Sequence, residues 1–206
     1  IEPGSSLGVA LATGDISLTS VGTVTSCDGD TVLGFGHPMY LRGQIDFPMS
    51  LAYVHFTWPS SFISYKMASG GPVVGAIRQD RRFGIAGVLG EIPDMLPVEL
   101  NITGGVRPHT IRYQVVRDRD MAPNLIGIGL FGSLYELEKI AGPATIELTT
   151  RIDIEGHEPI VRNNFYTDDG GLIRAAQAAL APLAFLSRNP FEPIHINSIT
   201  IDVDFT

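Results

Sequence analysis

The sequence predicts a mainly β protein of the β-rich α+β class, with two helices in its C-terminal half. Most of its apolar residues fall in short stretches where they alternate with polar residues, which is the period of a strand with one buried face. Helical spacing appears in two longer segments, 123–140 and 172–186. With 44% hydrophobic and only 17% charged residues among 206, the chain can bury a substantial core.

Glycine, proline and aspartate separate the predicted strands of the N-terminal part. Residues 16–21 alternate apolar and polar side chains after the apolar run at 7–12. The pair Asp28-Gly29 is typical of a hairpin turn because both residues tolerate positive φ, and residues 31–35 form the return strand. The further strands predicted in this part are 51–58, 62–67, 72–77 and 84–90.

The C-terminal part adds the two helices to a second set of alternating segments. Gly142-Pro143 is expected to end the first helix, and the polar stretch 167–171 provides an N-cap region for the second. Strands are predicted over 98–103, 110–118, 144–154, 159–166 and 194–205. The stretch 91–97 contains two prolines and reads as a linker, so we predict a β-rich region over 1–92 and an α+β region over 98–206, packed on the first.

Charge and composition exclude several functions. The formal net charge of -8 argues against nucleic-acid binding, which requires a positive surface. No apolar run approaches the roughly 20 residues of a transmembrane helix, so no membrane span is expected in this chain. The single cysteine, Cys27, cannot form an internal disulfide and leaves the cellular compartment open. An oligomer or larger assembly is compatible with this composition.

Two short motifs in the N-terminal part carry residues suited to nucleophilic catalysis. Gly36-His37-Pro38 offers an imidazole base, and Ser69-Gly70-Gly71-Pro72 offers a hydroxyl followed by two glycines. A serine hydroxyl becomes a strong nucleophile when a neighbouring imidazole removes its proton. His55 is a second candidate base, although a strand histidine at a sheet surface is the simpler explanation of it. The five histidines lack the spacing of a helical zinc site, so no metal and no cofactor are predicted.

The order of these motifs resembles a known family. Ser69-Gly70-Gly71-Pro72 is similar to the nucleophile motif of chymotrypsin-like serine proteases, and its pairing with Gly36-His37-Pro38 resembles the SpoIVB peptidase family of bacterial serine endopeptidases. The segments 3–9 and 22–25 are also similar to the opening of that domain, so the resemblance covers roughly residues 1–90.

The resemblance implies a chymotrypsin-like barrel in the N-terminal part and a defined set of site residues. Ser69 would be the nucleophile, His37 the base, and Asp46 the carboxylate that orients His37, because it is the only acidic residue between them. The backbone around Ser69 would bind the oxyanion and the substrate, and the residues assigned to this role are Met67, Ala68, Gly70 and Gly71.

Two functional hypotheses follow from the resemblance. The first is a serine endopeptidase that cleaves a protein or peptide substrate. The alternative is a non-catalytic module with a protease fold, which serves binding or assembly in a bacterial envelope protein; Ala68, which stands where chymotrypsin-like enzymes have aspartate, favours it. The resemblance implies a periplasmic or secreted location and leaves a cytoplasmic one open. A short distance between Ser69 and His37, with a carboxylate behind His37, would distinguish the peptidase.

Overall fold

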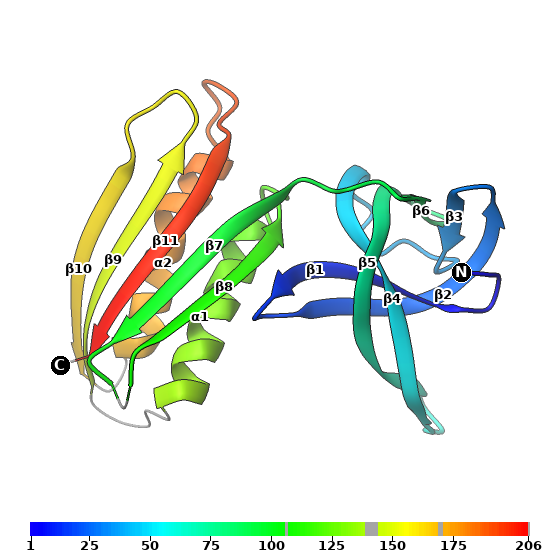
Figure 1. The fold of residues 1–206 in the computed structure, drawn as a ribbon, viewed down its shortest axis with the longest axis horizontal. Coiled ribbons are helices and arrows are strands. Elements are labelled where there is room, and N and C mark those ends of the chain that lie inside the picture. The colour runs from blue at the N-terminus through cyan, green and yellow to red at the C-terminus, as the bar shows by residue number, and fades with distance from the viewer. Residues whose placement is uncertain (106, 139–143, 169–170, 206) are drawn as a thin grey trace. The chain divides into compact units, whose positions relative to one another are not determined.

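The computed structural model describes residues 1–105, 107–138, 144–168 and 171–205. These residues form a mainly β protein, with eleven strands in a mixed sheet and two helices, both in the C-terminal half (Figure 1). The predicted fold class is thereby confirmed.

The chain divides into two compact units. Unit 1 comprises residues 1–13 and 17–94, and unit 2 comprises residues 14–16 and 95–206. The division after Asp94 falls inside the proline-containing stretch 91–97, and the segment 14–16 joins unit 2 although it lies early in the sequence.

Six strands make up unit 1. They are β1 (Ser6–Gly14), β2 (Leu18–Asp28), β3 (Thr31–Gly34), β4 (Gly43–Trp58), β5 (Tyr65–Arg81) and β6 (Gly84–Leu89). Their order is β1-β2-β3-β6-β5-β4, and a short antiparallel pairing of β1 with β4 adds a further link. This arrangement is a partial ring of strands, and we do not assign it as the barrel that the resemblance implied. Its core contains the fully buried side chains of Leu7, Met49, Ile77 and Ile85.

The longest strands of unit 1 differ from the sequence prediction. The two short strands predicted at 62–67 and 72–77 are replaced by one strand of 17 residues, β5, which includes all of 72–77 but only residues 65–67 of the first. The Ser-Gly-Gly-Pro motif therefore lies within a strand and does not form a turn. Gly70 and Gly71 both lack the positive φ that nine other glycines of the described chain adopt, so their backbone continues the strand.

Unit 2 is a sheet with two helices. Its elements are β7 (Met95–Thr103), β8 (His109–Val116), α1 (Ala122–Glu138), β9 (Ala144–Ile154), β10 (Ile160–Asp168), α2 (Gly171–Ser187) and β11 (Ile196–Phe205). The strand order is β10-β9-β11-β7-β8, in which β11 and β7 are parallel and the other neighbours are antiparallel.

Both helices lie on the same face of the unit 2 sheet (Figure 1). Their apolar residues meet those of the strands in a core that includes Leu100, Ile126, Leu130, Leu148 and Ile201. Both helices were predicted from helical spacing. The predicted stop at Gly142-Pro143 and part of the predicted N-cap region at 167–171 lie outside the described residues.

Candidate functional site

The serine singled out by the sequence is joined to a histidine, and that histidine is His55. The Nε2 atom of His55 lies 2.7 Å from the Ser69 Oγ atom. In the tautomer with an unprotonated Nε2, the serine hydroxyl donates this hydrogen bond, which is the arrangement that a general base requires. Both side chains are exposed.

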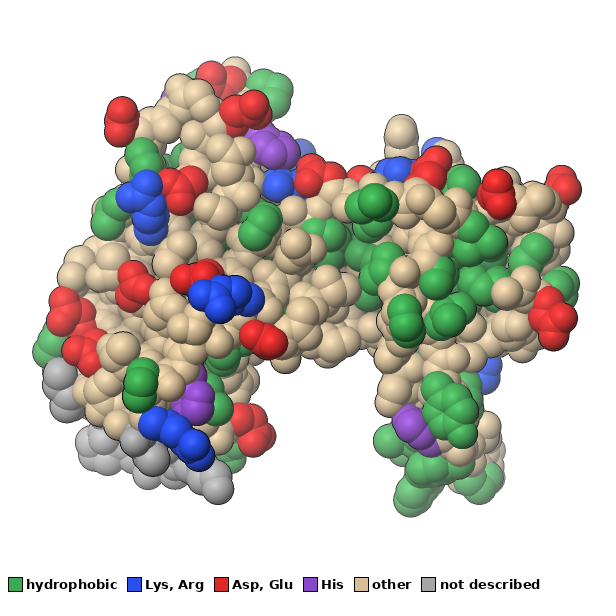
Figure 2. Space-filling model, viewed as in Figure 1, with side chains coloured by type: hydrophobic (Ala, Val, Ile, Leu, Met, Phe, Trp, Pro, Cys, Tyr) green, Lys and Arg blue, Asp and Glu red, His purple; other side chains and the backbone are tan. Residues whose placement is uncertain are grey.

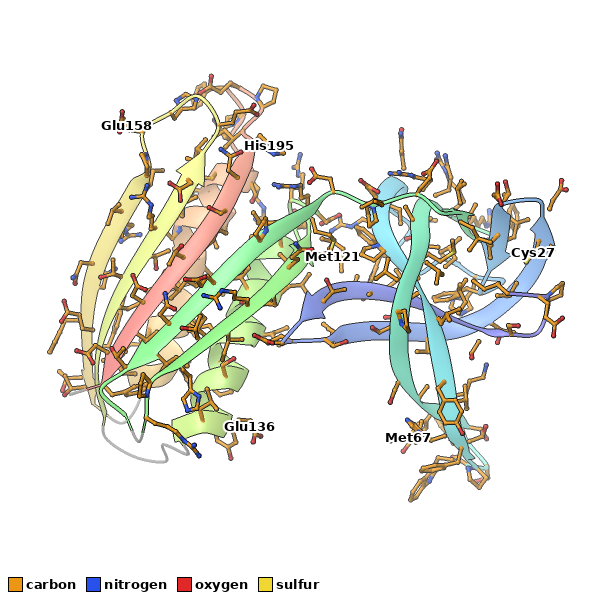
Figure 3. The ribbon with its side chains drawn as sticks, in the orientation of Figure 1. Cys27, Met67, Met121, Glu136, Glu158 and His195 are labelled. Atoms are coloured by element: carbon orange, nitrogen blue, oxygen red, sulfur yellow. The ribbon has the colours of Figure 1, made fainter. Side chains whose placement is uncertain are left out.

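The hairpin formed by β4 and β5 brings these two residues together. Ser69 pairs with Tyr53, and a shift of register between Val54 and Phe56 places His55 at a bulge. The rings of Tyr53 and His55 meet edge to face with centroids 5.0 Å apart, a contact that holds the imidazole beside Ser69. Figure 3 labels Met67, which lies two residues before Ser69 on the same strand.

His37, which was predicted to be the base, lies in contact with other residues. Its Nδ1 atom lies 2.8 Å from the carbonyl oxygen of Pro38, and its ring packs against Phe35, whose own ring lies against Gly22 of β2. Ser69, in contrast, points away from β2. Its neighbour Gly70 faces Thr19 of β2, and successive residues of a strand point to opposite faces. The structure therefore joins Ser69 to His55 and anchors His37 beside β2.

Asp46, predicted to orient His37, is bound elsewhere. Its carboxylate forms an ion pair with Arg78 of β5 and accepts a hydrogen bond of 2.9 Å from the backbone N–H of Asp94. Arg78 also pairs with Glu91. Asp46 thus connects β4 and β5 to the end of unit 1, which is a structural role.

The four residues assigned to the oxyanion site lie within β5, and Gly71 falls at a shift of register against β4. Met67 pairs with Phe56 of β4. Ala68 and Gly70, which flank Ser69 along β5, pair with Val54 and Ala52 of β4. Successive N–H groups of an extended strand point in opposite directions, so they do not converge on one oxygen as an oxyanion site requires. Packing explains why positions 70 and 71 are glycine. A Cβ atom at Gly70 would collide with Thr19, and one at Gly71 would lie 3.3 Å from the Leu51 carbonyl oxygen.

A buried carboxylate organises the loop after β3. The sequence pattern did not reveal it. Asp80 is fully buried and accepts hydrogen bonds from the backbone N–H groups of Met39, Tyr40 and Arg42, at 2.8, 2.7 and 3.2 Å. In the sequence, Asp80 stands between Gln79 and the two arginines Arg81 and Arg82. Its position in a stretch of polar residues gave no signal of burial.

The far part of this hairpin, residues 53–69, is unusually apolar, and we call it the apolar hairpin. It contains no aspartate or glutamate, and its one charged side chain is that of Lys66, which bonds to Thr23 Oγ1 at 2.7 Å. Figure 2 shows its hydrophobic side chains gathered at the surface. Its large exposed apolar residues are Tyr53, Phe56, Trp58, Phe62, Ile63, Tyr65 and Met67.

The loop at the end of the apolar hairpin is held by serine hydroxyls. Ser60 Oγ accepts hydrogen bonds from the backbone N–H groups of Phe62 and Ile63, and Ser64 Oγ accepts one from the N–H of Ser60. These bonds fix the loop while Phe62 and Ile63 remain 92% and 68% exposed. The loop is therefore shaped to present apolar side chains to the outside.

Two other kinds of functional feature, a metal-binding cluster and a membrane-spanning helix, are absent from the described part of the chain. Within it, no three His, Cys, Asp or Glu side chains gather in the way that a metal ion requires. No helix in the described ranges combines the length and apolar character needed to cross a membrane. The site is thus a serine–histidine pair on an exposed, apolar strand pair, in a mainly β protein.

Comparison with known proteins adds no relative to this description. Neither a protein-family model, nor a curated protein, nor a solved structure matches the chain. The resemblance to the SpoIVB peptidase family consequently remains a prediction from the motifs.

Proposed function

We propose that this chain is a non-catalytic binding or assembly module that associates with a protein partner through the apolar hairpin. The observation that carries the proposal is a set of seven large apolar side chains on this hairpin with exposed fractions between 42% and 92%. We further propose that the module works in the bacterial cell envelope, in a periplasmic or secreted protein.

The size of the exposed surface supports a binding role. A large side chain contributes about 150–250 Å² when fully exposed, so these seven residues present on the order of 800 Å² of apolar surface. The largest apolar patch of a typical monomer is about 300–600 Å². Leaving the larger area in water is costly, and association with a partner removes that cost.

The test is site-specific photo-crosslinking in cells that produce the protein. A photoreactive phenylalanine analogue at Phe62, in the apolar hairpin, should give crosslinked protein adducts. The matched control is the same analogue at Phe83, which is 85% exposed but lies in the turn between β5 and β6. Equal adduct yields at the two positions, or none at Phe62, would contradict the proposal.

A second candidate function is a serine endopeptidase in which Ser69 is the nucleophile and His55 is the base. The 2.7 Å contact between Ser69 Oγ and His55 Nε2 favours it. No interaction of a carboxylate with His55 accompanies this contact among the described residues, so the pair resembles a triad without its orienting acid.

Labelling with a fluorophosphonate tests the peptidase candidate. Reaction at Ser69 should disappear in Ser69→Ala and fall strongly in His55→Gln, whereas Ser61→Ala, an exposed serine of the same hairpin, should label normally. Labelling of the unchanged protein no greater than that of Ser69→Ala would rule this candidate out.

A further inference from the structure

We infer that a cavity in unit 2 binds a small molecule that carries a carboxylate on an apolar body. The cavity has a volume of about 460 Å³, which lies within the range of about 300–1,000 Å³ that is typical of small-molecule sites. All of its lining residues belong to unit 2, whereas the apolar hairpin belongs to unit 1. The inference therefore goes beyond the proposed function and does not depend on it.

The cavity lies at one end of the unit 2 sheet, where segments far apart in the sequence meet. The strands β7 and β11 begin at this end, and β8 ends there, with Val116 paired to Met95. The first turn of α1, the last turn of α2 and the loop between α2 and β11 supply the remaining walls. Figure 3 labels His195, a lining residue that directly precedes β11. Loops at the end of a rigid sheet are common positions for binding groups.

One part of the cavity wall is apolar. Its apolar side chains are those of Leu96, Ala122, Leu186, Pro193, Ile194 and Ile196. Leu96, Ala122 and Ile196 are buried, so packing within the unit holds them in place. A wall of this kind favours a ligand with an apolar body, because binding removes that body from water.

The loop between α2 and β11 is held in place by one of the lining residues, Asn189. Its Nδ2 atom donates a hydrogen bond of 3.3 Å to the carbonyl oxygen of Glu192, and its Oδ1 atom accepts one of 3.1 Å from the N–H of Phe191. The backbone N–H of Asn189 also donates to the carbonyl oxygen of Leu186 at the end of α2. This wall is therefore formed before a ligand binds, which lowers the entropic cost of binding.

Two arginines line the cavity and give it an affinity for anions. The Nη1 atom of Arg117 donates a hydrogen bond of 2.5 Å to the carbonyl oxygen of Ile196, which fixes this side chain in the wall. Arg119 is exposed and forms no ion pair with another described residue. A guanidinium group can bind a carboxylate through two parallel N–H bonds. Arg119 is therefore the residue that we expect to bind the carboxylate of the ligand.

The two acidic residues of the cavity wall have partners within the protein. The Oδ1 atom of Asp118 accepts hydrogen bonds from the N–H groups of Asp120 and Met121, at 3.0 and 2.9 Å, at the start of α1. The Oε1 atom of Glu192 lies 3.8 Å from the Nε2 atom of His157, which does not line the cavity. Because both carboxylates have partners and Arg119 has no ion pair, the cavity favours an anionic ligand over a cationic one.

NMR titration of the nitrogen-15-labelled protein with octanoate tests the inference. Octanoate is the probe because it joins a carboxylate to an apolar chain. The backbone N–H signals of Ala122, Ser187 and Ile196 should shift and reach saturation below about 10 mM. Octanamide, which has the same length without the charge, should bind at least about fivefold more weakly. Shifts confined to the apolar hairpin, no saturable shift at the cavity, or equal affinity for the two compounds would overturn the inference.

The variant Arg119→Gln tests the residue assigned to the carboxylate. It should weaken octanoate binding at least about fivefold and leave octanamide binding unchanged, because it removes the charge from an exposed side chain. The matched control is Arg151→Gln, which removes an exposed arginine of β9 in the same unit, outside the cavity. An equal effect of the two variants on octanoate would show a general charge effect and would refute the assignment.

These outcomes are distinct from those that test the proposed function. A protein that crosslinks through Phe62 but shows no octanoate shift at the cavity would refute this inference alone. A protein that binds octanoate at the cavity but gives no Phe62 adducts would refute only the proposed role of the apolar hairpin.

Discussion

Replacing Asp80 by asparagine should destabilise unit 1 more than any other change of one carboxylate to its amide in that unit. Asp80 is fully buried and holds three backbone N–H groups, one on Oδ1 and two on Oδ2. Asparagine has the same shape but only one acceptor atom. Its NH2 group must face at least one backbone N–H of the loop that follows β3. Both groups are hydrogen-bond donors, so neither can bond to the other.

The magnitude follows from the number and type of these bonds. A hydrogen bond to a charged group contributes about 1.5–3 kcal/mol, and a buried donor left without a partner costs about 1–3 kcal/mol. Asp80→Asn loses one bond outright and removes the charge from the other two. We expect a loss of about 2–4 kcal/mol in the free energy of unfolding of unit 1.

Denaturant unfolding measures this loss. Trp58 is the only tryptophan and lies in unit 1, so its fluorescence follows that unit, and circular dichroism provides a second signal. The control is Asp30→Asn, an exposed turn residue of the same unit. If the two variants differ by less than about 1 kcal/mol, the argument that Asp80 anchors the loop fails.

Three further changes have defined outcomes. Ser50→Ala removes a fully buried hydroxyl that has no hydrogen-bond partner among the described residues. Unfolding experiments should therefore show unchanged or higher stability, by up to about 1 kcal/mol, and a large loss would mean that the hydroxyl is bound. Gly70→Ala should cost about 1–3 kcal/mol because its Cβ collides with Thr19, and Thr19→Ala should recover part of this in the double variant; no recovery would contradict the collision. Burial raises the pKa of Tyr113, so the neutral phenol stabilises the fold below pH of about 10, and this contribution is lost progressively above that pH. Tyr113→Phe should reduce the loss of folded protein at alkaline pH that circular dichroism records. The same alkaline loss in both proteins would contradict this.

The fold class was predictable because periodicity reports which face of an element is buried. Alternation identified strands such as 144–154, and helical spacing identified the regions of α1 and α2. The extent of β5 was not predictable in the same way. Glycine and proline at 70–72 favour a turn locally, but pairing with β4 and the crossing of β2 hold this segment extended.

The partner of Ser69 depended on strand register. His55 and Ser69 lie at nearly equal distances on either side of the loop between β4 and β5, so a hairpin centred on that loop brings them together. This symmetry was available in the sequence. The motif resemblance favoured His37 instead, and no local pattern indicated that Phe35 anchors His37 beside β2.

The two glycines after Ser69 show why a motif alone does not establish a catalytic site. In a protease turn, such glycines make room for substrate and oxyanion contacts, whereas here Gly70 makes room for the side chain of Thr19. The crossing of β2 and β5 is therefore sufficient to explain the motif without catalysis. The contact of Ser69 with His55 bears on chemistry, whereas the exposed apolar side chains of the apolar hairpin bear on association. Because Ser69 is not one of the large exposed apolar residues of the apolar hairpin, Ser69→Ala should abolish any fluorophosphonate labelling without reducing crosslinking through Phe62, so one variant separates the two functions.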